Sequence, residues 1–160
     1  MNMLIIDLHQ NSVVDYNTYE ISLSNQLEEL EKLTDWLNEL SEDLKISPQT
    51  AFRIDLILTE TVTNIIENAY DDEPIHLIKI KLQYRHGRIT LRVEDEGIPF
   101  NPLERPEFEF TNNLEDVKIG GLGIHLIRSY SDECHYRRKN DKNRLDVVIY
   151  DLPQEQIKAE

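Results

Sequence analysis

Two consecutive stretches of helical periodicity near the start of the chain limit the architecture that it can adopt. Six leucines recur at spacings of three or four over residues 27–44, and a second apolar stripe runs over residues 54–69. Each stripe is typical of an amphipathic helix that buries one face. Ser47 and Pro48 are favoured types where the second helix begins, and Asn25 is expected to cap the first. Two such helices in succession need a common apolar layer to cover.

Four strand-like segments supply that layer. Residues 75–84 and 88–95 flank a tight turn at residues 86–87, and residues 133–139 and 144–150 flank a turn-forming stretch. Such pairs indicate β-hairpins. A doubly wound parallel sheet would need a helix between each pair of strands, and the pattern predicts none there. We therefore predict an α+β fold, a two-layer sandwich in which helices cover one face of a mixed, mostly antiparallel sheet.

The length and composition fit one domain. The chain has 160 residues, of which 39% are hydrophobic and 30% charged, as in a globular rather than a disordered protein. We predict a domain over residues 19–151, preceded by a strand or arm over residues 1–18 and followed by a polar tail over residues 152–160. The first residues lack the basic segment and cleavage site of a signal peptide. No apolar run reaches the roughly 20 residues that a membrane helix needs.

The formal net charge of −14 limits the partners. Phosphate backbones repel so acidic a chain, so we expect no direct binding to nucleic acid. A nucleotide site would need backbone N–H groups and a divalent cation to hold a polyanion against this field. Cys134 is the only cysteine, which excludes an intrachain disulfide and suits the cytoplasm. We assign no metal role to the scattered histidines, and the basic run at residues 137–139 is expected to be a solvated turn.

The second predicted helix carries a polar face opposite its apolar stripe. Glu60, Asn64 and Asn68 follow one another at intervals of four residues, so they share that face. A carboxylate and a carboxamide oxygen one turn apart are hard ligands that suit Mg²⁺. A solvated polar face is the alternative, although asparagine is a poor helix former in the middle of a helix.

Two further segments are compatible with a nucleotide site. Asp95 ends an apolar strand beside Gly97, where a carboxylate can accept a hydrogen bond from an exocyclic amine such as that of adenine. The same pattern also marks ordinary turns. Three glycines at residues 120–123 stand directly before a helix and suit a backbone cradle for phosphate, with a flexible loop as the alternative. The intervening loop, residues 101–119, has the length of a lid.

Together these segments resemble the three nucleotide-binding boxes of the Bergerat-fold (GHKL) ATPases. The matching sequences are ETVTN at 60–64 with NAY at 68–70, DEGIPFNP at 95–102 and GGLGI at 120–124. The likeness is greatest to the bacterial anti-sigma-factor serine/threonine kinases and covers about residues 19–150. It implies a histidine-kinase-like ATPase fold and a site for ATP.

The resemblance also implies roles for individual residues. Asn64 would ligate a Mg²⁺ ion that bridges the ATP phosphates, and Glu60 would be the general base on the attacking hydroxyl or water. Asp95 would bind the adenine amine, and Gly97 would allow close approach. The other positions that would contact the nucleotide are Asn68, Gly120, Gly121, Leu122 and Gly123.

The function implied is that of an ATP- and Mg²⁺-dependent serine/threonine protein kinase of anti-sigma-factor type. It would phosphorylate an antagonist protein and so regulate a sigma factor and transcription, with a homodimer favoured by the same likeness. The alternative is a nucleotide-dependent partner-switching module with little or no phosphotransfer. Thr61, Asn68 and Asn101 stand where closer relatives usually carry Ala, His and Asp. Arg105 and Lys118 of the lid are candidates to contact phosphate.

Overall fold

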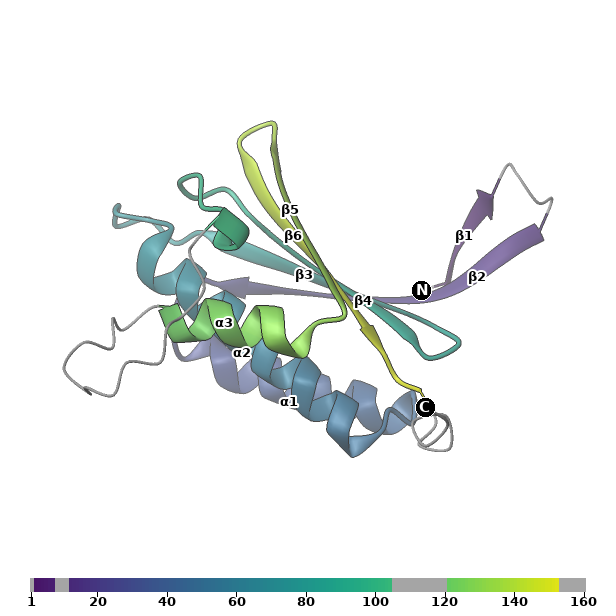
Figure 1. Ribbon diagram of the computed structural model, residues 1–160. Coiled ribbons are helices and arrows are strands. Elements are labelled where there is room, and N and C mark those ends of the chain that lie inside the picture. The colour runs from purple at the N-terminus through teal and green to yellow at the C-terminus, as the bar shows by residue number, and fades with distance from the viewer. Residues whose placement is uncertain (1, 8–11, 105–120, 153–160) are drawn as a thin grey trace.

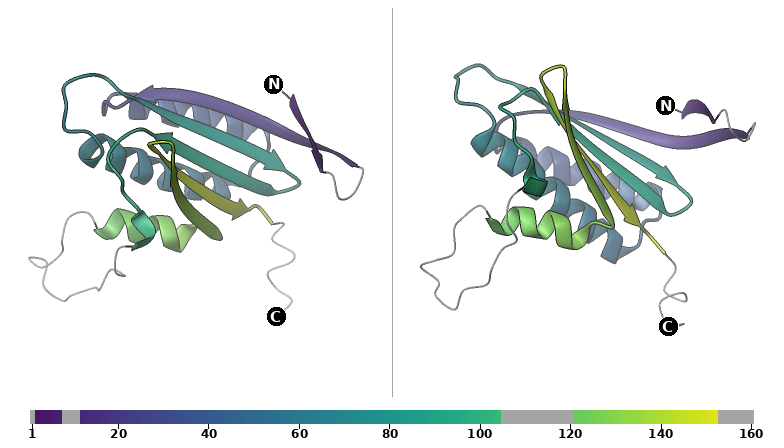
Figure 2. Two further views of the ribbon diagram at one scale, coloured as in Figure 1. Left: turned by 90° about the horizontal axis from the view of Figure 1, so that it is seen from above. Right: turned by 45° about the horizontal axis from the view of Figure 1, so that its top comes forward.

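A computed structural model describes residues 2–7, 12–104 and 121–152, and it confirms the predicted α+β architecture. Three α-helices lie together on one face of a single sheet (Figure 1, Figure 2). In the described chain, the opposite face of the sheet carries no helix. None of the helices in these ranges has the length and apolar character needed to cross a membrane.

The strands and helices follow the predicted order. The strands are β1 (Asn2–Asp7), β2 (Ser12–Ser24), β3 (Leu77–Arg85), β4 (Arg88–Asp95), β5 (Glu133–Lys139) and β6 (Lys142–Tyr150). The helices are α1 (Glu29–Asp43), α2 (Pro48–Asn68) and α3 (Gly121–Tyr130), with a short 3-10 helix, η1, at Pro102–Glu104. β2 begins inside the segment predicted to be a strand or arm, because its first half pairs with β1, and this hairpin extends past the helices (Figure 1). The domain boundaries stay predictions.

The position of β6 brings together segments that are distant in the sequence. The six strands of the described residues lie in the order β1-β2-β3-β4-β6-β5, and all neighbours are antiparallel. The chain therefore leaves β4, passes through α3, forms β5 at the edge and returns as β6 beside β4. As a result Asn143, near the start of β6, lies opposite Asp95, at the end of β4.

The hydrophobic core lies between the sheet and the helices. In β3 the inward residues Ile78, Ile80 and Leu82 are 0–1% exposed, and the residues between them face outward. Leu58 and Val62 of the predicted α2 stripe are fully buried. Burial of an aliphatic side chain of this size stabilises a fold by about 1.5–3 kcal/mol. The buried stripe thus fixes the rotation of α2 and with it the direction of the polar face.

Local signals explain where the helices begin. Ser47 caps α2 as predicted, because its Oγ accepts a hydrogen bond from the Thr50 N–H at 3.3 Å. The predicted cap at Asn25 is wrong, since α1 begins at Glu29 without a side-chain cap. Asn25 Oδ1 instead accepts a hydrogen bond from the His76 N–H at 2.8 Å. That hydrogen bond joins the segment just before α1 to the residue just before β3.

Both predicted hairpins turn over two residues in the left-handed region. His86 and Gly87 have φ angles of 46° and 77°, and Asn140 and Asp141 have 52° and 58°. Two-residue turns of this kind match the twist of the strands that they join. At Gly87 a Cβ atom would lie 2.7 Å from the carbonyl oxygen of Asp151, so a side chain has no room there.

Candidate functional site

A narrow pocket lies between α2, α3 and the adjoining ends of β4 and β6. Asn64, Asn68 and Asp95, three of the residues expected to contact a nucleotide, line it. Its apolar wall is formed by Ile65, Ala69, Val93, Phe100, Ile127 and Leu145. The cavity measures about 40 Å³, well below the roughly 300 Å³ at which ligand pockets usually begin. A nucleotide base therefore requires these walls to move apart.

Asp95 is the buried acid of the pocket and is only 6% exposed. Within the described chain, both hydrogen bonds to its carboxylate are accepted by Oδ1, from the Gly97 N–H at 2.8 Å and from Asn143 Nδ2 at 2.9 Å. Burial raises the pKa of Asp95, and these hydrogen bonds together with the charge of Arg138 oppose the rise. Oδ2 keeps its capacity to accept a hydrogen bond from an amine in the pocket.

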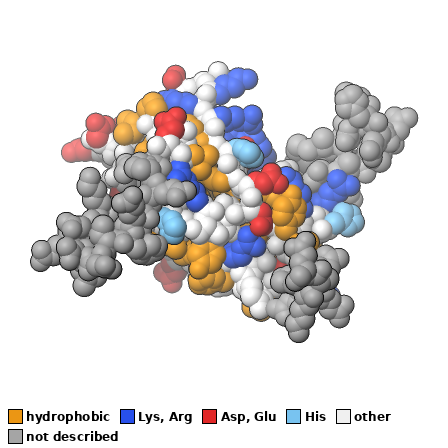
Figure 3. Space-filling model, viewed as in Figure 1, with side chains coloured by type: hydrophobic (Ala, Val, Ile, Leu, Met, Phe, Trp, Pro, Cys, Tyr) orange, Lys and Arg blue, Asp and Glu red, His pale blue; other side chains and the backbone are white. Residues whose placement is uncertain are grey.

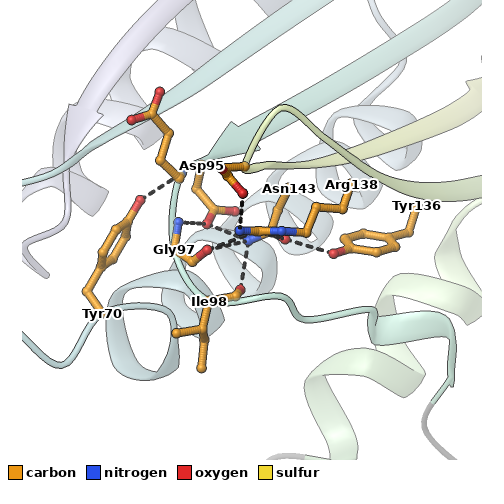
Figure 4. A network of polar contacts seen from close by, with 9 residues as sticks. Tyr70, Asp95, Gly97, Ile98, Tyr136, Arg138 and Asn143 are labelled. Atoms are coloured by element: carbon orange, nitrogen blue, oxygen red, sulfur yellow. Dashed lines mark hydrogen bonds and ion pairs between the residues drawn. The ribbon is translucent and has the colours of Figure 1, made fainter.

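Asn143 is the centre of the polar network beside Asp95, and reasoning from the sequence missed it (Figure 4). Its Nδ2 donates to Asp95 and, at 3.4 and 2.9 Å, to two carbonyl oxygens of the turn that follows β4. Its Oδ1 accepts hydrogen bonds from the Tyr136 hydroxyl at 2.7 Å and from Arg138 Nη1 at 2.9 Å. Asn143 is 5% exposed, so its amide depends on these partners. Only the pairing of β4 with β6 reveals this role.

The basic run at residues 137–139 is not a solvated turn throughout. Arg137 and Lys139 are exposed, whereas Arg138 is partly buried and donates from Nη1 to the Gly97 carbonyl oxygen at 3.0 Å. Successive residues of a strand point to opposite faces, which separates Arg138 from its neighbours. The structure confirms the strand predicted over residues 133–139 as β5, so the expectation of a solvated turn fails for Arg138, which lies within that strand. Arg138 therefore connects β5 with the turn after β4.

Gly97 is required by close packing against the end of α2. A Cβ atom at this position would lie 2.5 Å from the Cβ of Ala69 and 2.6 Å from the Ala69 carbonyl oxygen. The Ile98 N–H donates to that carbonyl at 2.9 Å, and the Glu96 N–H donates to the Tyr70 hydroxyl at 2.9 Å. The turn after β4 is thus held by α2. The carboxylate at the end of β4 is consequently positioned from the helix as well as from the sheet.

The polar face of α2 meets the first turn of α3. A Cβ atom at Gly123 would lie 2.5 Å from Glu60 Oε2 and 3.4 Å from Asn64 Nδ2. Asn68, one turn further along α2, is exposed, and its Nδ2 donates to the Asn64 carbonyl oxygen at 3.1 Å. Leu122 in the same turn of α3 is 43% exposed. The N-terminal end of a helix carries backbone N–H groups without helical partners, which favours an anion there.

The structure thus brings predicted residues of α2, β4 and α3 to one end of the sheet. Glu60 is not among the residues that line the pocket, and it lies instead beside the start of α3. Gly121 is the first residue of α3. Gly120, Arg105 and Lys118 lie outside the described residues.

Comparisons with known proteins agree with this arrangement. The model of the histidine kinase-like ATPase domain family matches residues 23–149. The serine/threonine-protein kinase BtrW of Bordetella bronchiseptica is 23% identical over 119 residues, which cover 74% of this chain and 84% of BtrW. The anti-sigma F factor of Clostridium novyi is 25% identical over 58% of this chain and 64% of its own length. The serine-protein kinase RsbW of Listeria innocua is 28% identical over 59% of this chain and 57% of its own length.

Two solved structures share the fold. The RsbU and RsbW domains of Rv1364c from Mycobacterium tuberculosis align over 84% of this chain and 32% of that chain, with a TM-score of 0.60 and 12% identity. The blue-light activated histidine kinase EL346 of Erythrobacter litoralis aligns over 81% of this chain and 42% of that chain, with a TM-score of 0.55 and 18% identity. At these identities the likeness concerns the fold alone. Because the family model spans most of the sequence, the chain belongs to the histidine kinase-like ATPase domain family.

Proposed function

We propose that this chain binds ATP and transfers its terminal phosphate to a serine or threonine of another protein, as a kinase of the anti-sigma-factor type. The observation that carries the proposal is the meeting of Glu60 and Asn64 with Gly123 at the start of α3, next to a pocket that holds Asp95. A carboxylate, a carboxamide and a helix N-terminus at one point suit a phosphate group and its attacking hydroxyl. The kinase names of BtrW and RsbW support the reaction class.

Asp95 would hold the adenine ring. Its Oδ2 would accept a hydrogen bond from the exocyclic amine, while Gly97 and Asn143 keep Oδ1 in place. The aliphatic and aromatic wall of the pocket suits a flat, largely apolar ring, as in most cofactor pockets. The polar end of the pocket would therefore select the base, and the apolar wall would supply most of the affinity.

Asn64 and the first turn of α3 would hold the phosphates and a Mg²⁺ ion. Among the described residues no group of three His, Cys, Asp or Glu side chains could hold a metal ion. A metal would therefore depend on the carboxamide oxygen of Asn64 together with phosphate oxygens and water, which is a usual manner of binding for Mg²⁺. Bound Mg²⁺ supplies neutralisation of the phosphate charge. Asn68, Gly120, Gly121 and Leu122 would complete the nucleotide contacts.

Glu60 would accept the proton of the attacking hydroxyl. α2 holds its carboxylate beside Gly123, and the missing side chain of the glycine leaves space next to Oε2. In the transfer, the hydroxyl oxygen forms a bond to the terminal phosphorus, the bond between that phosphorus and the leaving ADP oxygen breaks, and the proton moves to Glu60. Glu60 would thus be the catalytic residue, and the other groups would position the nucleotide.

The acceptor would be an antagonist protein, and a sigma factor would be the protein that the kinase holds when the antagonist is phosphorylated. The anti-sigma F factor name of one relative supports this assignment. The cytoplasm is the compartment in which both partners would meet the kinase. A homodimer remains part of the proposal.

Phosphate transfer from radiolabelled ATP to a candidate antagonist tests the proposal, with Glu60→Gln compared with Glu67→Gln. Glu67 is an exposed carboxylate on the same helix and is the matched control. We expect Glu60→Gln to lose at least about a hundredfold in transfer rate, since a general base contributes that much, and to keep its affinity for ATP. A wild type that binds ATP but labels no serine or threonine would favour the partner-switching module. An unchanged rate in Glu60→Gln would remove Glu60 from the mechanism.

A further inference from the structure

The open face of the sheet, opposite the helices, has a charge unlike that of the whole chain. The chain carries a net −14, but the described part of this face holds nine of the 17 Lys and Arg residues and only five of the 31 Asp and Glu residues. The basic residues are Lys79, Lys81, Arg85, Arg88, Arg92, Arg137, Lys139, Lys142 and Arg144. The acidic residues are Glu20, Glu94, Glu96, Glu133 and Asp146. Figure 3 shows Lys and Arg side chains gathered over the upper part of the molecule, where the β5–β6 hairpin rises.

The strand register arranges these side chains in two rows across five strands. Directly paired positions form the first row, Ser22, Lys79, Glu94, Arg144 and Arg137. The neighbouring row consists of Glu20, Lys81, Arg92, Asp146 and His135. Paired residues on one face of a sheet are within reach of one another. The face is therefore an ordered array of charges rather than a scatter of solvated side chains.

Asp146 orients the arginines at the centre of this array. Its two oxygens accept hydrogen bonds from Arg92 Nε at 2.7 Å and from Arg144 Nε at 2.9 Å, and Arg137 Nη2 lies 4.0 Å away. Arg92 and Arg144 are 28% and 22% exposed. These hydrogen bonds use Nε, so Asp146 leaves the terminal Nη groups of both guanidiniums able to donate to another acceptor, and Arg144 Nε also lies 3.9 Å from Glu94 Oε1. A guanidinium held in this way matches the two oxygens of a carboxylate.

An apolar edge adjoins the arginines. A hollow of about 230 Å³ over β2, β3 and β4 shares Lys79 and Glu94 with a second hollow of about 300 Å³ toward the entrance of β3. Ile75 and Leu77 line the second hollow and are 64% and 57% exposed. The two hollows thus form one continuous surface, in which basic and acidic side chains alternate along the sheet and Ile75 and Leu77 add apolar area at one end.

We propose that this open face docks an acidic segment of a partner protein, whose carboxylates meet Arg92, Arg144 and Lys79 and whose apolar side chain rests on Leu77. Charge complementarity selects such a partner, because the face carries an excess of positive charge on a chain of net −14. Nucleic acid fits less well, since Glu94 and Asp146 interrupt both basic rows and the whole chain repels phosphate. The docking uses the side of the sheet away from the helices and stands whether or not the chain is a kinase.

The test is the affinity of the full chain for a fluorescent peptide rich in glutamate with a central pair of leucines. The double variant Lys79→Gln with Arg137→Gln removes two exposed charges from the face. Lys32→Gln with Lys45→Gln removes the same charge from exposed positions on or beside α1, so it is the matched control. Circular dichroism and thermal unfolding establish that both variants are folded.

We expect the face variant to weaken peptide binding roughly fivefold, as two exposed ion pairs allow, and the control to change it less than twofold. Binding should weaken further with salt and with serine in place of the two leucines. Equal binding by the two variants, or by a peptide with glutamine in place of glutamate, would overturn the proposal. So would tighter binding of a DNA duplex than of the peptide. Self-association that the face variant abolishes would instead assign the surface to a second copy of the chain.

Discussion

Replacing Asn143 with alanine should both destabilise the fold and weaken ATP binding. The change removes five hydrogen bonds between buried or partly buried groups, one of them long at 3.4 Å. A hydrogen bond contributes about 1 kcal/mol net, and a buried group left without a partner costs more. Some of the freed groups retain other partners, so we expect a loss of about 3 kcal/mol in the free energy of unfolding. For a domain of this size that corresponds to a fall of roughly 6–12 °C in Tm.

The effect on ATP follows from Asp95. Without Asn143 the carboxylate loses one of the two hydrogen bonds that oppose the rise of its pKa, so the pKa of Asp95 rises further. Asp95 Oδ1 also loses one of the two donors that hold the carboxylate in place. We expect the Kd for ATP to rise about tenfold, which corresponds to about 1.4 kcal/mol.

Urea unfolding and isothermal titration calorimetry with ATP and Mg²⁺ measure the two quantities. The control is Asn38→Ala on the exposed surface of α1, where alanine should be neutral or slightly stabilising. A loss of stability below about 1 kcal/mol in Asn143→Ala would refute the account of the network. A large loss of stability with an unchanged ATP affinity would show that the network does not position Asp95 for the nucleotide.

Three further predictions give the direction in which stability, ATP binding, transfer rate or thiol reactivity should change. Gly123→Ala should keep or raise stability by up to about 1 kcal/mol in urea unfolding, because alanine favours a helix, but should slow phosphate transfer, because its Cβ displaces Glu60 Oε2. Asp95→Asn should abolish ATP binding in calorimetry. It should also gain stability relative to wild type as the pH rises through the folded pKa of Asp95. Burial raises this pKa above 3.8, so the stability contributed by the protonated acid is complete below the unfolded pKa and is lost as the pH rises through the folded one. Cys134 should react with iodoacetamide roughly a hundredfold more slowly in the native protein than in urea, because burial raises the pKa of its thiol to about 11.

Local patterns predicted the elements well where one residue decides the backbone. Ser47 and the turn at His86 and Gly87 lie where the sequence indicated, because a cap and a two-residue turn depend only on neighbouring atoms. Asn25 shows the limit of such reasoning. Its side chain is a plausible cap for α1, but the N–H of His76, 51 residues later in the chain, takes its oxygen. The competition is decided by a tertiary contact that no local pattern contains.

The residues of the candidate site also fall into two groups, those that local sequence patterns could indicate and those whose position depends on tertiary contacts. The shared face of Glu60 and Asn64 was predictable from helical spacing. Gly123 was expected directly before a helix, but it lies within the first turn of α3, which begins at Gly121. Asn143 and Arg138 were not predictable, because their roles depend on the return of β6 beside β4. A hairpin can join a sheet by either of its strands, and only the strand that pairs with β4 can reach the carboxylate at its end.

α2 links the two ends of the site, one beside the start of α3 and the other beside the turn after β4. Substitutions at the two ends should therefore have separate effects on ATP affinity and on turnover. Glu60 lies beside α3, and Ala69, nine residues later, holds the turn after β4 through its carbonyl oxygen. At about 1.5 Å per residue the helix sets these points roughly 13 Å apart. Because Ile54, Leu58 and Val62 of the apolar stripe are at most 1% exposed, the helix acts as a rigid spacer. Changes at Asn143 should therefore act on the Kd for ATP and leave turnover at saturating ATP intact, whereas changes at Gly123 should act on turnover. Only a change in the shared stripe, such as Leu58→Ala, should alter both.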